Sequence, residues 1–167
     1  INVDIPQSQI GMYQPGILNT VSHMGKVWGY PRAFSTKALF MNCDLLEQAG
    51  VACEGPKTWD ELYTMAEAVT NNVPGVAGIG LTGKDFDNTM HQFLNYLYSN
   101  GGQVIDPDTN TITLNSSNAV EALAFYGKLA NVAQEGPLAY ERSQLRDLLN
   151  DKKIAMYIDG PWGRGTH

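Results

Sequence analysis

The segment from Gly78 to Lys84 has the spacing of a loop that could bind phosphate. It reads Gly-Ile-Gly-Leu-Thr-Gly-Lys, which satisfies the pattern GxGxxG and all but the last position of the pattern GxxxxGK[ST]. In such a loop the hydroxyl that follows the lysine reaches a magnesium ion. Here Asp85 stands in its place, and the carboxylates of Asp85 and Asp87 would repel a phosphate. We therefore interpret the segment as a strand that leaves through a glycine-rich turn, with a nucleotide-binding enzyme domain as the alternative.

Other patterns typical of enzymes and metal sites are missing from the sequence. It contains three histidines, His23, His91 and His167, and no GxSxG motif. Cys43 and Cys53 are ten residues apart, without CxxC spacing or a neighbouring histidine, which argues against zinc. They would form a disulfide if the short helix between them folds back, and spacing alone leaves this open. We predict no catalytic activity, no cofactor and no metal.

Trp162 is the side chain best placed in the sequence to bind a small molecule. It follows Gly160-Pro161, where the chain reverses, so a central core position is less expected. A sugar presents an apolar C–H face on which an indole can stack, while polar groups bind its hydroxyls. The residue type is equally consistent with packing at the edge of a lobe. Trp28 and Trp59 have strand or helical spacing around them, and we expect both in the core.

The composition is that of one acidic globular domain. The chain has 167 residues, of which 43% are hydrophobic, and a formal net charge of -6, which is about one domain. The negative charge disfavours a nucleic-acid partner. No apolar run is long enough to predict a membrane-spanning helix, and no segment at the start has the features of a signal peptide.

Strand and helix patterns alternate along the chain, which predicts an α/β layer fold. The expected strands are 26–30, 38–42, 76–81 and 155–159, with a hairpin of 103–105 and 111–113. The expected helices are 45–49 with Asp44 as cap, 58–69, 90–97, 116–129 and 141–150. Thr58 and Glu61 form a capping box. On the helix 116–129 we expect the buried side to hold Val120, Leu123, Ala124, Phe125 and Leu129.

Six blocks of the sequence, in order, resemble one protein family over about residues 25 to 163. The blocks are Gly25–Pro31, Phe40–Val51, Gly55–Leu62, Phe93–Gly102, Asn115–Tyr126 and Lys153–Trp162. The family is that of the family 1 extracellular solute-binding proteins of bacterial ABC importers, the maltose-binding-protein-like group. Several spaced blocks in the right order are more specific than any single motif.

The resemblance implies two α/β lobes joined by crossing strands, with a sugar held in the cleft between them. This chain would be a single lobe of a periplasmic-binding-protein-like (type II) fold, helix-rich around a small mixed sheet. Residues 1–30 would be a remnant of the first lobe and the first crossover strand, 31–160 the second lobe, and 161–167 a return segment. The hinge positions would be Tyr30, Pro31, Asp159, Gly160 and Pro161.

The resemblance also implies the residues that bind the ligand. Trp162 matches the family's stacking aromatic at the second crossover. Ser35 matches a cleft position where the maltose binder has a carboxylate, and His91 falls near a tyrosine position of that protein. We expect hydrogen bonds to the ligand from Ser35, His91, Gln92 and Arg32. Because Ser35 and His91 depart from the maltose binder, the sugar is left open.

We predict one lobe of a carbohydrate receptor whose partners are a sugar and, through the intact parent protein, an ABC permease. Its location would be the extracellular face of a bacterial cell envelope, either periplasmic or as a membrane-anchored lipoprotein. A lone lobe keeps about half of the contacts, so we expect sugar binding of about millimolar order or weaker. The alternatives are the nucleotide-binding enzyme domain and a lobe that docks a protein through an exposed face.

Overall fold

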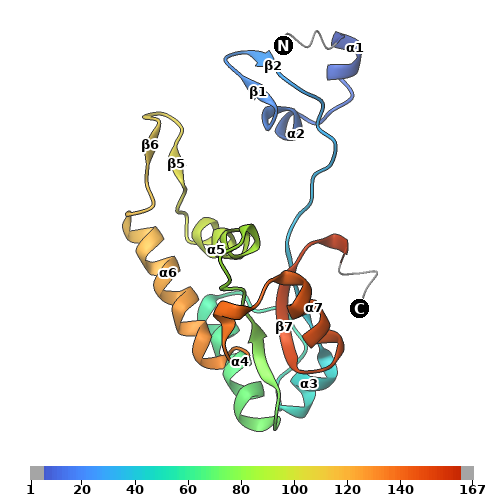
Figure 1. Cartoon of the computed structure of the whole chain (residues 1–167), viewed down its shortest axis with the longest axis vertical. Helices are drawn as coiled ribbons and strands as arrows, with labels where there is room; N and C mark the ends of the chain where they lie inside the picture. The colour runs from blue at the N-terminus through green and yellow to red at the C-terminus, as the bar shows by residue number, and fades with distance from the viewer. Residues whose placement is uncertain (1–5, 163–167) are drawn as a thin grey trace. The chain divides into compact units, whose positions relative to one another are not determined.

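The computed structural model of the protein describes residues 6–162 (Figure 1). The chain divides into two compact units, of which the first ends at Thr36 and the second begins at Lys37. The resemblance implies a boundary after Tyr30. The assignment of residues 1–30 to the remnant of a first lobe stays a prediction, and most of the predicted return segment lies outside the described residues.

The first unit consists of short elements, as far as the structure describes it. Its elements are α1 (Gln7–Ile10), α2 (Pro15–Asn19), β1 (Ser22–His23) and β2 (Lys26–Val27). The two strands form an antiparallel hairpin. None of the described side chains of the first unit is fully buried. The expectation that Trp28 lies in a core is therefore wrong. Its indole is 49% exposed and donates to the carbonyl of His23, at 3.1 Å.

The second unit is built on a three-stranded mixed sheet. Its strands are β3 (Ala38–Met41), β7 (Ile154–Asp159) and β4 (Ala77–Gly80), in that order across the sheet. The central strand β7 pairs antiparallel with β3 and parallel with β4. Four consecutive residues of β7, from Ile154 to Tyr157, are completely buried, as expected for a strand covered on both faces.

Helices cover this sheet and a small hairpin extends from them (Figure 1). The helices are α3 (Cys43–Gln48), α4 (Trp59–Asn72), α5 (Asp87–Ser99), α6 (Ser117–Leu129) and α7 (Arg142–Asn150). Two short 3₁₀ helices are η1 (Ala130–Val132) and η2 (Pro137–Ala139), and the hairpin joins β5 (Ile105–Asp106) to β6 (Thr111–Ile112). The helix-rich α/β lobe predicted from the sequence is thus confirmed.

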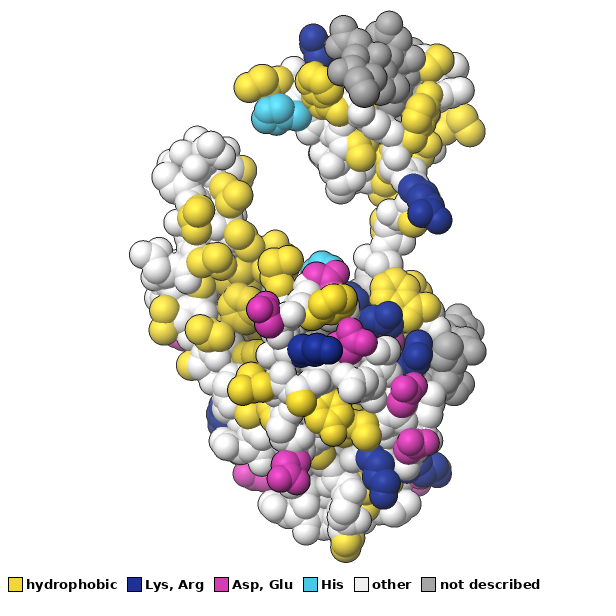
Figure 2. Space-filling view, in the orientation of Figure 1, with side chains coloured by type: hydrophobic (Ala, Val, Ile, Leu, Met, Phe, Trp, Pro, Cys, Tyr) yellow, Lys and Arg dark blue, Asp and Glu magenta, His cyan; other side chains and the backbone are white. Residues whose placement is uncertain are grey.

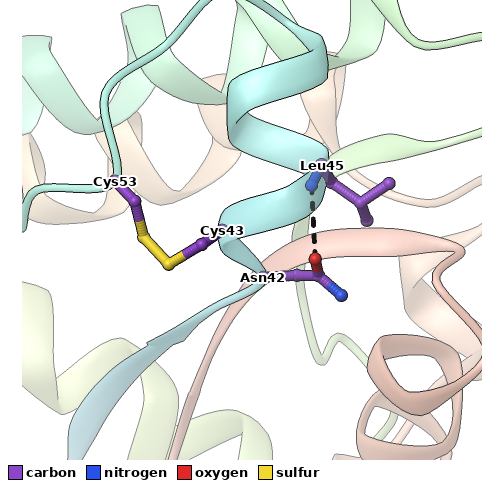
Figure 3. Close-up of a disulfide and its surroundings, with 4 residues drawn as sticks. All are labelled: Asn42, Cys43, Leu45 and Cys53. Atoms are coloured by element: carbon purple, nitrogen blue, oxygen red, sulfur yellow. Dashed lines mark hydrogen bonds between the residues drawn. A yellow bond between two sulfur atoms is a disulfide. The ribbon is translucent and has the colours of Figure 1, made fainter.

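Side-chain caps fix where two of these helices begin. The hydroxyl of Thr58 accepts the N–H of Glu61 at 3.1 Å, as expected, and the Glu61 carboxylate accepts the N–H of Lys57. The predicted cap of α3, however, is wrong. Asn42 accepts the N–H of Leu45 at 3.2 Å (Figure 3), so α3 starts before Asp44.

The buried face of α6 differs from the expectation. Ala119, Ala122, Phe125 and Leu129 are buried, whereas Val120 and Leu123 are 58% and 61% exposed. Apolar residues occupy both faces of this helix in the sequence, so their period does not distinguish the two faces. The choice follows from packing, because Phe125 stacks on Trp59 with ring centroids 4.7 Å apart. The expectation that Trp59 packs with the core is confirmed.

A disulfide resolves the question that the spacing of the cysteines leaves open. Cys43 and Cys53 are bonded, with their Cα atoms 5.2 Å apart (Figure 3). The bond joins the first turn of α3 to the loop that follows this helix. It closes a short loop around α3, and such a constraint stabilises the fold by limiting the unfolded chain.

Candidate ligand-binding site

Trp162 is held in place by the last residue of the central strand. Asp159 ends β7 and is completely buried. Its Oδ1 accepts the indole N–H of Trp162 at 2.8 Å and the backbone N–H of Gly160 at 2.7 Å. Its Oδ2 accepts the hydroxyl of Tyr157. The predicted hinge residues Asp159 and Gly160 therefore form a bonded turn that orients the ring.

Gly160 allows the ring to fold back onto the turn. A Cβ atom at this position would lie 2.3 Å from two carbons of the Trp162 ring. No side chain fits there unless the indole moves. The position of the ring thus depends on a carboxylate that binds its N–H and on a glycine that leaves space for its face.

The surroundings of Asp159 favour the ionised form of its carboxyl group. Burial by itself would raise its pKa, but hydrogen bonds from Tyr157, Gly160 and Trp162, together with the charge of Arg142, outweigh burial and lower the pKa. Burial and the hydrogen bond to Asp159 raise the pKa of Tyr157. The hydroxyl therefore stays protonated and donates to the carboxylate.

Two cations lie over the Trp162 ring. The Nζ atom of Lys37 is 4.9 Å from the ring centroid, and the Cζ atom of Arg142 is 5.0 Å from it. Arg142 also pairs with Asp159 at 3.2 Å. Partial burial lowers the pKa of Lys37, and Arg142 adds to this, against the opposing charges of Asp159 and Asp87. Trp162 itself is 43% exposed, so a ligand can reach part of the ring.

The two site residues predicted on α5 have different surroundings. His91 is exposed on this helix. Gln92 is only 5% exposed, and its Oε1 accepts the N–H of Thr82 and the hydroxyl of Tyr126, each at 3.1 Å. Its Nε2 donates to the carbonyl of Ile158. Gln92 thus connects α5 to the sheet, and its role in ligand binding stays a prediction.

The other predicted site residues belong to the first unit. Arg32 and Ser35 are exposed there. The hydroxyl of Tyr30 donates to the side-chain oxygen of Gln9 at 2.6 Å. The structure thus brings together Trp162, Asp159 and Gly160 in the second unit, and the roles of Arg32, Ser35 and the Tyr30-Pro31 hinge stay predictions.

Lys37, Arg142 and Tyr157 were missed by the sequence reasoning. Tyr157 has a signal in the sequence, because it is two residues before Asp159 on a strand and so shares its face. Lys37 has no such signal in the sequence. It is placed near Asp159 by the register of the sheet, in which Ala38 pairs with Asp159. Arg142 begins a different helix, α7.

The glycines that resemble a phosphate loop are explained by packing. A Cβ at Gly78 would lie 1.9 Å from the carbonyl oxygen of Ala66, so α4 and β4 touch through their backbones. A Cβ at Gly80 would lie 2.5 Å from the Cδ1 atom of Ile154. The nucleotide-binding alternative is not favoured.

Residues 6–162 hold no group of three or more His, Cys, Asp or Glu side chains that could bind a metal ion. Within the same described stretch, no helix is long and apolar enough to cross a membrane.

Solved structures of two solute-binding proteins share the fold of this chain. An ABC transporter solute-binding protein from Thermotoga lettingae TMO, bound with α-D-tagatose, superposes with a TM-score of 0.81 at 29% identity. The match covers 90% of this chain and 39% of that one. Maltose-bound MalE3 of T. maritima gives a TM-score of 0.80 at 28% identity, covering 93% of this chain and 40% of that one.

A family model described as bacterial extracellular solute-binding protein matches residues 1–166. The chain belongs to this family. A Deinococcus radiodurans protein named as a probable ABC transporter-binding protein is 28% identical over 168 residues, which is 97% of this chain and 40% of that protein. The chain therefore spans less than half the length of the relatives that it matches.

Proposed function

We propose that this chain supplies one lobe of a carbohydrate-binding receptor that serves an ABC importer, and that it performs no catalysis. The observation that carries the proposal is Trp162, a partly exposed indole that a buried carboxylate orients at the end of the central strand. Two further findings support the proposal. The chain belongs to the solute-binding family, and two similar structures contain tagatose and maltose. The receptor would act at the extracellular face of a bacterial cell envelope, where it delivers the sugar to a permease.

The Trp162 turn can contribute to sugar binding in two ways. The exposed part of the indole offers an apolar surface to the C–H face of a sugar ring. The ring is already fixed by Asp159 and by the close approach to Gly160, so its ordering adds little to the entropy lost on binding. Of the residues that the resemblance implies, Arg32 would donate hydrogen bonds to sugar hydroxyls, and Ser35 and His91 would donate or accept them.

One lobe by itself should bind weakly. Small-molecule sites enclose most of the surface of their ligand, and this chain covers only about 40% of its structural relatives. We expect dissociation constants of about millimolar order for the chain alone.

Titration of the chain with D-tagatose and with maltose tests the proposal. The measurement is the NMR spectrum of the chain: the indole N–H of each of its three tryptophans gives one signal, and the backbone amide signals report binding in variants that lack an indole. We expect the Trp162 signal to move with at least one sugar, and Trp162→Ala to abolish binding. Trp28→Ala is the matched control, because Trp28 is also about half exposed and lies in the other unit. Sugar binding that survives Trp162→Ala would contradict the proposal.

A second candidate function is docking to a protein, and exposed hydrophobic side chains favour it. They lie on the hairpin and on α6, and comprise Ile105, Ile112, Leu114, Val120 and Leu123. Figure 2 shows hydrophobic side chains gathered over these elements. If this surface were the functional one, Leu123→Gln would impair partner binding and Trp162→Ala would not.

A further inference from the structure

Two cations lie over the ring of Trp162. They are Lys37 and Arg142, and among the described residues the carboxylate of Asp159 accepts the indole N–H and pairs with Arg142. Asp87 also acts on Lys37, but it makes no ion pair with it. The chain as a whole has a net charge of -6, so two cations on one ring stand out from the general charge of the protein.

Of these two cations, Lys37 makes no ion pair with a described residue. The ion pairs among the described residues are Arg142 with Asp159, Arg146 with Asp147, and Lys152 with Asp44, and none includes Lys37. Asp159 and Asp87 act on Lys37 only from a longer distance. Its side chain is nevertheless half-buried. A cation removed from water in this way gains from an anion that approaches it.

The sheet fixes Lys37 beside the turn. Ala38 pairs with Asp159 in the antiparallel ladder between β3 and β7, so Lys37 lies next to Gly160 and reaches the ring of Trp162. A surface lysine would be free to turn away into solvent. The position of Lys37 instead follows from the register of the central strand pair.

We infer that the ligand of this site is a carbohydrate that carries a carboxylate, with its ring against Trp162 and its carboxylate bound by Lys37. This inference rests on the proposed function and specifies its ligand class. A neutral sugar that displaces Lys37 from the indole removes a cation–π contact and offers the ammonium group no counter-charge. A sugar acid gives the displaced ammonium group a new partner. A phosphorylated sugar fits less well, because Asp159 and Asp87 would repel its second charge.

Titration of the chain with D-galacturonate and with its methyl ester tests this inference. The two probes share the sugar ring and differ in charge, and the Trp162 indole N–H signal reports binding of each. We expect the acid to bind about threefold more tightly than the ester, since the pair with Lys37 remains partly exposed. Added salt should reduce the preference.

Three variants assign the preference to a residue. Lys37→Gln should make the acid and the ester bind equally, and Lys37→Arg, which keeps the charge, should retain the preference. Lys57→Gln is the control, because Lys57 is an exposed lysine at the start of α4. The amide spectrum of each variant shows whether its fold is unchanged.

The outcomes separate this inference from the proposed function. Equal binding of acid and ester by the unmodified chain overturns the inference and leaves the sugar-binding proposal standing. A preference that survives Lys37→Gln also overturns it, as does an equal response to sodium acetate, which has the charge but no ring. If no sugar moves the Trp162 signal, both proposals fail.

Discussion

Two neighbouring strands of the second unit end in glycine-containing segments that both look functional in the sequence. Strand β4 leads into Gly80 to Lys84, and β7, its parallel neighbour, leads into Asp159 to Trp162. At Gly78 of β4, the missing side chain makes room for the backbone of α4. At Gly160 it makes room for a half-exposed indole. A glycine pattern therefore indicates a close approach, and the atom that approaches decides whether the segment is structural or functional.

The largest effect that we predict is that of Gly78→Ala. The new Cβ would lie 1.9 Å from the carbonyl oxygen of Ala66, and a backbone contact can be relieved only if α4 moves away from β4. We expect a loss of about 3 kcal/mol in the free energy of unfolding, the upper part of the range for overpacked cores. Urea denaturation measures it.

Gly80→Ala is the matched control for this variant. Its Cβ would meet the end of the Ile154 side chain at 2.5 Å, which can turn aside more easily than a backbone. We expect a loss of about 1 kcal/mol, at the lower end of the same range. Equal losses for the two variants would show that the close contact of α4 with β4 does not determine the stability.

The second effect in size is that of Asp159→Asn. The amide keeps the shape of the carboxylate but leaves Arg142 without its counter-charge. We expect a loss of about 2 kcal/mol at neutral pH, as for a hydrogen bond to a charged group. Because the folded state lowers the pKa of Asp159, its stabilising effect is complete above the unfolded value of about 3.9 and is lost as the pH falls through the lowered folded value.

Denaturation of both proteins over a range of acid pH tests this assignment. The stability of the unmodified chain should approach that of Asp159→Asn as the pH falls. A difference between the two proteins that stays constant down to the lowest pH at which both fold would show that Asp159 is not the titrating group.

Gly160→Ala should have a smaller effect on stability and a larger effect on the ligand. The Cβ would collide with the Trp162 ring rather than with the backbone, and the half-exposed ring can swing outward. We expect a change of about 1 kcal/mol or less in stability, with a changed Trp162 signal and loss of sugar binding. Sugar binding that remains unchanged would show that the orientation of the ring is unimportant.

The sequence predicts the elements of the second unit more reliably than the contacts of its side chains. Periodicity, Thr58 and Glu61 place α4 to within a few residues, and the resemblance gives the class of fold. The sequence pattern does not select the buried face of α6, because Ala122 and Leu123 lie on different faces that are both apolar. Local patterns decide where an element lies, and packing against distant elements decides which side is buried.

The site shows the same limit. Trp162 follows from its own surroundings in the sequence, whereas Lys37 and Arg142 reach it from a strand and a helix far away in the chain. Only the pairing of β3 with β7 brings Lys37 to the ring. The predicted role of Gln92 depended on the register of α5, and the structure turns its amide toward Thr82 and Tyr126.

The smallest effect that we predict is that of magnesium ATP on the unfolding temperature. The β4 end has Asp85 where a phosphate loop needs a hydroxyl, and α5 begins only at Asp87, beyond the glycines. A ligand that binds the folded state raises the unfolding temperature at saturating concentration, so we expect no shift here and none for Lys84→Ala. A shift that Lys84→Ala removes would restore the nucleotide alternative, and the two strand ends would then both be functional. Without such a shift, the end of β7 stays the proposed ligand site, because there the close neighbour of the glycine is a side chain that solvent can reach.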